Sequence, residues 1–206
     1  QAVVLDESAP QGASARSATT APGKPVLPIS EDGLLKMSAT AARQVGESLA
    51  GEYSFAEPFP HIVLENFLPE SVARMALEEL PKRPLESDIN FEMGYAGQFK
   101  RQILPEDCGE RARKLFHFFN SAPMLQFLEG LTNIQSLIPD PYFSGGGYHE
   151  TARGGYLGVH ADFRVNETLH IHRRINVIIY LNEHWPEEYG GSLELWDRSM
   201  TQCCAK

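Results

Sequence analysis

The sequence predicts an α+β, mainly β domain with supporting helices near its N-terminus. Apolar residues recur at helical spacing in several stretches before Leu131. From about Pro139 onward, short runs rich in Val, Ile, Leu and Tyr alternate with turn residues, as they do in strands. Helices followed by a series of short strands are typical of a β-sandwich or barrel that rests on N-terminal helices.

The chain is predicted to have three parts. Residues 1–30 are rich in Ala, Ser, Thr, Pro and Gly, and such a composition buries too little apolar surface to offset its ordering entropy, so we expect a disordered tail or linker. Residues 31–57 form a short helical lead-in, with a helix expected over residues 34–49. The folded domain then covers residues 58–206.

Proline positions and apolar spacing predict the first elements of this domain. Pro69 is suited to the start of a helix, and Pro81 ends it. Ser121 is a suitable N-cap for a later helix. The expected elements are a strand at 61–65 and helices at 70–80, at 106–120 and from Ser121 onward.

The second half of the domain is predicted to consist of short strands. Each run has the branched and aromatic content of a strand and is bounded by turn residues. These runs cover residues 156–163, 174–181 and 192–196.

Composition and charge narrow the possible partners. The 206 residues are 42% hydrophobic and 22% charged, as in an ordinary globular domain, and the net charge is −9. Basic residues are scattered rather than clustered, so we expect no nucleic-acid partner. No apolar run approaches the roughly 20 residues that cross a bilayer, so we expect no membrane partner either. The oligomeric state stays open.

The cysteines lead to a prediction about the compartment. Cys108, Cys203 and Cys204 form neither a disulfide framework nor a Cys-x-x-Cys metal site. Thiols of this kind favour a reducing compartment, and we therefore expect a cytoplasmic protein.

His160 and Asp162 flank Ala161 within the predicted strand at 156–163. Side chains alternate along a strand, so both project to the same side. Two His and one carboxylate form a facial set that suits non-haem Fe(II), and this pair would supply two of the three. A strand His bonded to a neighbouring carboxylate explains the same residues without a metal.

Two longer stretches surround this pair, GGGYHETARGGYLGVHADF and RRINVIIYLNEHWPEEYGGSLELWD. Together they resemble the prolyl-4-hydroxylase-like branch of the Fe(II)/2-oxoglutarate-dependent oxygenases, densely from about Pro139 to Asp197. The matching features, in chain order, are Gly154-Gly155 before the His-x-Asp strand, then Arg174, Asn176, Tyr180, Leu181 and Asn182, then Trp185, and finally Gly190-Gly191 before a Leu-x-Leu-Trp strand.

The resemblance implies a double-stranded β-helix, or jelly-roll, core and a set of site residues. His160 and Asp162 would bind the iron. The Tyr180 phenol would bind the distal carboxylate of 2-oxoglutarate, although a core Tyr is the alternative. His149 is a further candidate to face this cofactor, and a simple loop His is as good an explanation. Fe(II), 2-oxoglutarate and O2 are the implied cofactors, with ascorbate as an additional candidate.

The implied activity is that of a dioxygenase, which couples oxidative decarboxylation of 2-oxoglutarate to hydroxylation of a side chain or small metabolite. The substrate would be a small molecule or a peptide. The resemblance places the third ligand, a His, and a basic residue for 2-oxoglutarate tens of residues beyond Trp196, so we expect a chain truncated at Lys206. A non-catalytic binding or scaffold domain with the same fold is the alternative. A cupin-like site that uses His170 or His172 is less favoured, because Arg173-Arg174 would repel a cation.

Overall fold

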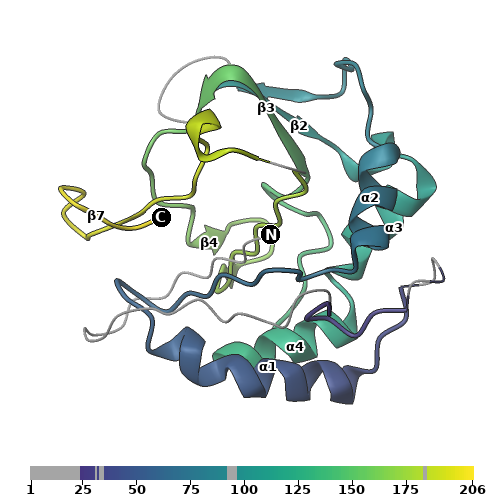
Figure 1. Cartoon of the computed structure of the whole chain (residues 1–206), viewed down its shortest axis with the longest axis vertical. Helices are drawn as coiled ribbons and strands as arrows, with labels where there is room; N and C mark the ends of the chain where they lie inside the picture. Colours follow the sequence, from purple (N-terminus) through teal and green to yellow (C-terminus); the bar gives the residue numbers. More distant parts are fainter. Residues whose placement is uncertain (1–23, 31, 33–34, 92–96, 183–184) are drawn as a thin grey trace.

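The computed structural model describes residues 24–30, 32, 35–91, 97–182 and 185–206. Helices and short antiparallel strands follow one another along the chain (Figure 1). In order, the elements are α1 (Ala39–Ser54), α2 (Glu70–Glu78), β1 (Ile89–Phe91), β2 (Gln98–Ile103), the 3-10 helix η1 (Pro105–Asp107), α3 (Glu110–Phe118), α4 (Ala122–Thr132), β3 (Tyr148–Tyr156), β4 (Val165–Asn166), β5 (Ile171–His172), the 3-10 helix η2 (Glu187–Tyr189), β6 (Leu195–Trp196) and β7 (Cys203–Ala205).

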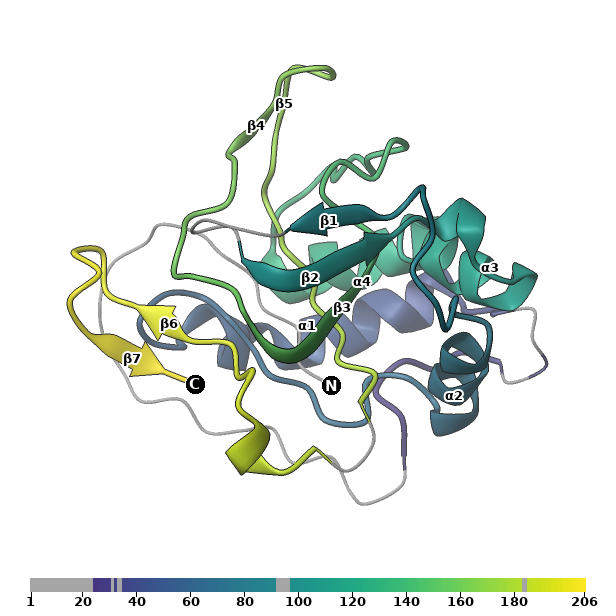
Figure 2. The same ribbon diagram turned by 90° about the horizontal axis from the view of Figure 1, so that it is seen from above.

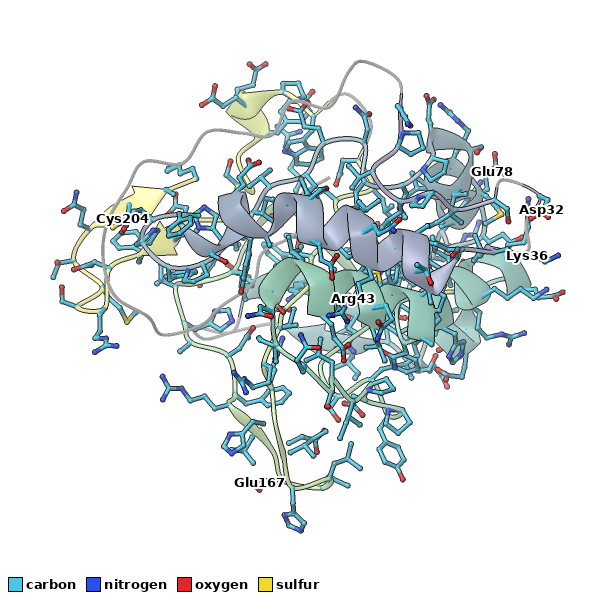
Figure 3. The ribbon with its side chains drawn as sticks, turned by 90° about the horizontal axis from the view of Figure 1, so that it is seen from below. Asp32, Lys36, Arg43, Glu78, Glu167 and Cys204 are labelled. Carbon is cyan, nitrogen blue, oxygen red and sulfur yellow. The ribbon has the colours of Figure 1, made fainter. Side chains whose placement is uncertain are left out.

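Helices α1 and α4 cross at very short distance because glycines lie at the crossing. A Cβ added at Gly46 would lie 2.2 Å from the backbone oxygen of Phe127, and one added at Gly130 would lie 2.5 Å from that of Arg43. The backbones therefore touch where any side chain would separate them. Beside this crossing, the Arg43 side chain reaches Gln126 and Glu129 of α4 (Figure 3).

The helix pair covers an apolar core that begins earlier in the chain than predicted. Val26 and Leu27 are buried, and their backbone N–H groups donate to the carbonyl oxygens of Asn66 (2.9 Å) and Phe67 (3.1 Å). The prediction of a disordered tail is therefore wrong for residues 24–30, because their apolar side chains fill the core. Residues 1–23 lie outside the described residues.

The main sheet has the order β1-β2-β3, with both pairings antiparallel. Figure 1 shows it on the side of the molecule opposite α1 and α4, with α2 and α3 at its flank. The guanidinium of Arg101 on β2 is largely buried and binds Asp88, at 2.9 Å, and Glu150 on β3. It also donates to the carbonyl oxygens of Pro81 and Arg83, and so fastens the segment after α2 to the sheet.

Two hairpins complete the described chain. β4 pairs with β5 and β6 pairs with β7, each antiparallel. Figure 2 shows the β4–β5 hairpin projecting away from the rest of the molecule. Glu167 marks its tip in Figure 3.

The helix predictions are largely confirmed, with shifted ends. The helix expected at 70–80 is α2, and the one expected from Ser121 is α4. Ser121 is the N-cap residue of α4 by position, but its side chain makes no capping hydrogen bond. The helix expected at 106–120 is divided into η1 and α3, and the one expected at 34–49 starts only after Ser38, whose side chain accepts from the Ala41 N–H.

The strand predictions are mostly wrong. β3 ends where the first predicted strand begins, residues 157–163 and 174–181 contain no described strand, and only β6 lies within 192–196. At 61–65, Ile62 and Leu64 form isolated bridges. In an extended segment every second side chain points to the same side, and Ile175, Val177 and Ile179 all pack against the core. A strand also needs a hydrogen-bonded neighbour, which this patterning does not specify.

The α+β class is confirmed, but the mainly β weighting is wrong for the described residues, where helices span more of the chain than strands do. The described strands form three separate sheets, and these do not close into a double-stranded β-helix. None of the helices in the described ranges combines the length and the apolar character needed to cross a membrane.

The helix crossing yields a first prediction. Gly46→Ala should destabilise the protein by about 1–3 kcal/mol, because the new methyl group forces the backbones of α1 and α4 apart. Urea unfolding measures this change in the free energy of unfolding. Gly51→Ala is the matched control on the same helix: nothing lies within 4 Å of its Cβ, and alanine should stabilise the helix there by about 0.5–1 kcal/mol. Equal stability of the two variants would contradict the proposed crossing.

Candidate active site

His160 and Asp162 lie beside each other in the segment that follows β3. His160 Nε2 is 3.4 Å from Asp162 Oδ1. His160 Nδ1 lies 2.7 Å from the carbonyl oxygen of Gly158, which can only accept, so Nδ1 carries a proton and donates it there. Nε2 is therefore the ring nitrogen that faces the carboxylate. The two side chains project to the same side, although the segment is not a regular strand.

The second oxygen of Asp162 is held by two donors from the segment after β5. Asn176 Nδ2 donates to Asp162 Oδ2 over 2.9 Å, and a terminal guanidinium nitrogen of Arg173 lies 3.1 Å from the same oxygen. The Arg173 guanidinium also lies 4.6 Å from the centre of the Phe163 ring, a cation–π contact. The backbone N–H of Arg173 donates to the Arg164 carbonyl oxygen (2.8 Å), which closes the base of the β4–β5 hairpin.

The spacing of the two donor atoms fits one divalent metal ion. Ligand atoms about 2.1 Å from an ion and roughly at right angles lie about 3 Å apart. The 3.4 Å between His160 Nε2 and Asp162 Oδ1 is close to this value. Within the part of the chain that the structure describes, no group of three or more His, Cys, Asp or Glu could hold a metal. The described residues thus bring together two of the three ligands that the resemblance implies.

His149 lies on β3 and shares a face of the sheet with Lys100 of β2, because Gln102 pairs with His149 and Lys100 with Thr151. The His149 side chain is exposed, although nearby protein atoms partly desolvate its ring. This desolvation, together with the nearby Lys100 ammonium, lowers the pKa of His149 to about 4, although a hydrogen bond to the Gly145 backbone acts in the opposite direction. The ring is therefore neutral at pH 7.

Lys100 links His149 electrostatically to Asp162. Burial lowers the pKa of the Lys100 ammonium, and the charge of Asp162 opposes that shift. Asp162 thus has two cationic neighbours, Lys100 and Arg173, in a chain whose net charge is −9. The surroundings of this carboxylate are locally positive and suit an anionic ligand.

Tyr180 is half-buried in the segment between β5 and η2. Burial raises the pKa of its phenol, while a hydrogen bond from the Leu193 backbone acts in the opposite direction. The phenol therefore stays protonated at neutral pH, and its O–H remains able to donate to an acceptor.

The sequence did not predict the residues that hold Asp162. Asn176 belongs to the matching motif, which implies no role for it, and the motif contains Arg174, whereas Arg173 contacts Asp162. Nothing in the sequence pointed to Lys100, since its proximity depends on the pairing of β2 with β3. His170 and His172 lie at the β4–β5 hairpin, and the described residues offer no three-ligand group that joins either of them to His160, so the cupin-like alternative gains no support.

The environment of His149 yields a second prediction. Its NMR titration should have a midpoint near pH 4, and Lys100→Met should move that midpoint upward because a neighbouring positive charge is lost. Since the unfolded state binds the His149 proton more tightly, the free energy of unfolding should rise with pH between about 4 and 6.5. His149→Gln should remove this contribution. A midpoint at the ordinary His value would contradict the described packing.

Comparison with known proteins bears on the same segment. The chain matches no curated protein and no solved structure. Residues 146–206 match the model of a family described as the 2OG-Fe(II) oxygenase superfamily. The matched range contains His160, Asp162, Asn176 and Tyr180. The match supports placing this segment in the 2OG-Fe(II) oxygenase superfamily, an enzyme superfamily whose description names iron(II) and 2-oxoglutarate.

Proposed function

We propose that this protein is a non-haem iron dioxygenase, which couples oxidative decarboxylation of 2-oxoglutarate to hydroxylation of a side chain or a small metabolite. The observation that carries the proposal is the approach of His160 Nε2 to Asp162 Oδ1, at 3.4 Å, inside the segment that matches the oxygenase family. Neither alone is sufficient, because a His beside a carboxylate is common and a family match names no residues.

The two donors have a defined role in this proposal. His160 and Asp162 hold Fe(II), and the iron supplies the activation of O2 and of 2-oxoglutarate when it is bound. Hydrogen bonding of His160 Nδ1 to the Gly158 carbonyl fixes the orientation of the imidazole ring, as such bonds do for metal-binding histidines. The described residues do not supply the third iron ligand, since no group of three or more His, Cys, Asp or Glu among them could hold a metal.

Tyr180 and His149 bind the cosubstrate in this proposal. The Tyr180 phenol is protonated at neutral pH, burial raises its pKa further, and its O–H can donate to a carboxylate of 2-oxoglutarate. A neutral His149 adds a polar group without a further charge, while Lys100 beside it supplies the positive charge that a dicarboxylate needs. No catalytic residue beyond these binding groups is proposed.

Finer features belong to the same proposal. The motif order favours the prolyl-4-hydroxylase-like branch, with a jelly-roll fold, a peptidyl or small-molecule substrate, and ascorbate as an additional reductant. A reducing compartment such as the cytoplasm is part of the proposal, because the number and spacing of the three cysteines match neither a disulfide framework nor a Cys-x-x-Cys site. The net charge of −9 argues against nucleic acid as substrate.

A non-catalytic binding or scaffold domain is the second candidate. The observation that favours it is the two-donor set, since no third His, Cys, Asp or Glu joins the pair within the described residues. Such a domain would retain the fold and the polar contacts of Asp162 without turnover.

The third prediction separates these two functions. The full-length protein, supplied with Fe(II), O2 and 2-oxoglutarate, should form succinate even without a substrate, at the slow uncoupled rate. His160→Ala and Asp162→Ala should each abolish Fe(II) binding and succinate formation, because each removes a ligand. His170→Ala and Glu167→Ala on the projecting hairpin are the matched controls and should retain both. Absence of succinate from the full-length wild type, with and without candidate peptides, would favour the scaffold function.

A fourth prediction concerns the cosubstrate. Tyr180→Phe should raise the KM for 2-oxoglutarate roughly 10-fold, which corresponds to the loss of one hydrogen bond to a charged group. Tyr189→Phe is the control, because Tyr189 is exposed and packs only its ring against Trp185. Equal KM values for the two variants would exclude Tyr180 from 2-oxoglutarate binding.

A further inference from the structure

We infer that Asn176 is the positioning residue of Asp162: by holding Oδ2, it presents Oδ1 alone, beside His160 Nε2, to a metal ion. This inference rests on the proposed function, because it concerns the same pair of ligands. It assigns a role to an asparagine that the sequence motif contains but does not explain.

A carboxylate needs such a restraint because rotation about its last torsion is soft and exchanges the two oxygens. Asp162 retains 40% of its side-chain surface, so packing alone does not fix its orientation. A hydrogen bond of 2.9 Å from Asn176 Nδ2 to Oδ2 distinguishes the two oxygens. Oδ1, at 3.4 Å from His160 Nε2, is then the oxygen next to the imidazole.

Arg173 contacts the same oxygen but differs from Asn176 in charge. Its guanidinium lies 3.1 Å from Oδ2 and also makes a cation–π contact with the Phe163 ring, 4.6 Å from the ring centre. A guanidinium neutralises the carboxylate, and its charge also repels a metal ion bound on the other oxygen. The amide of Asn176 donates without this repulsion, so it can orient Asp162 equally well with and without metal.

Asn176 reaches Asp162 because the β4–β5 hairpin lies between them in the chain and brings its two flanking segments together. The N–H of Arg173 donates to the Arg164 carbonyl oxygen at the hairpin base, and this places the two flanking segments side by side. Val177 and Ile179 then pack against the core, which anchors the segment that carries Asn176. The donor therefore comes from a fixed part of the backbone.

Co(II) titration of the full chain tests the inference, with the d–d absorption of the metal as the signal. Asn176→Leu keeps the branching of the side chain but removes the donor, and it should weaken Co(II) binding about 10-fold. It should also change the absorption bands, because Arg173 alone then restrains Oδ2, and its charge repels the bound metal. Asn176→Ala should behave in the same way. Asn182→Ala, at an exposed asparagine a few residues later, is the control and should match the wild type.

The possible outcomes are distinct. Unchanged affinity in Asn176→Leu and Asn176→Ala would overturn the inference, and so would weaker binding with unchanged bands, since that indicates general structural damage. His160→Ala tests the underlying function in parallel. If wild type and His160→Ala bind Co(II) equally, the proposed metal site itself fails; if His160→Ala loses binding while the Asn176 variants do not, only the role of Asn176 fails.

Discussion

The antiparallel pairing of β2 with β3 is the constraint on which the rest of the structure depends. It joins the helical first half of the chain to the segment that carries His160 and Asp162, which starts where β3 ends. Arg101 reinforces this pairing from one face of β2 through Asp88 and Glu150. Lys100, on the other face, is thereby held within electrostatic reach of Asp162. One strand thus carries the largely buried Arg101 with its ion pairs on one face and the lysine that interacts with Asp162 on the other.

The helices could be predicted from the sequence because their signals are local. Proline at the start of α2 and the apolar spacing of α4 suffice for elements whose hydrogen bonds lie within the element. The strands could not be predicted as well, because a ladder requires a partner elsewhere in the chain. Ile175, Val177 and Ile179 alternate along the predicted strand at 174–181 and pack against the core, yet they belong to no described strand.

The same distinction divides the candidate site. His160 and Asp162 are two residues apart, so their common direction follows from local geometry, and the family resemblance is the basis for predicting that they bind iron. The groups that orient and charge Asp162 come from far along the chain: Lys100 lies 62 positions before it and Asn176 lies 14 positions after it. Residue type alone does not predict these contacts, because the chain contains several Lys and Asn residues and only the fold determines which of them lie near Asp162.

The β4–β5 hairpin has a consequence for how this protein can vary. Asn166, the last residue of β4, binds Asp140 and Ser144 just below the tip of the hairpin, and the Arg173–Arg164 bond closes its base. The tip at residues 167–170 lies beyond these anchors and points away from the molecule. Insertions, deletions and substitutions at the tip should therefore leave the contacts of the Asp162 carboxylate unchanged. For the same reason, the tip is a suitable insertion point for a fluorescent label or an epitope.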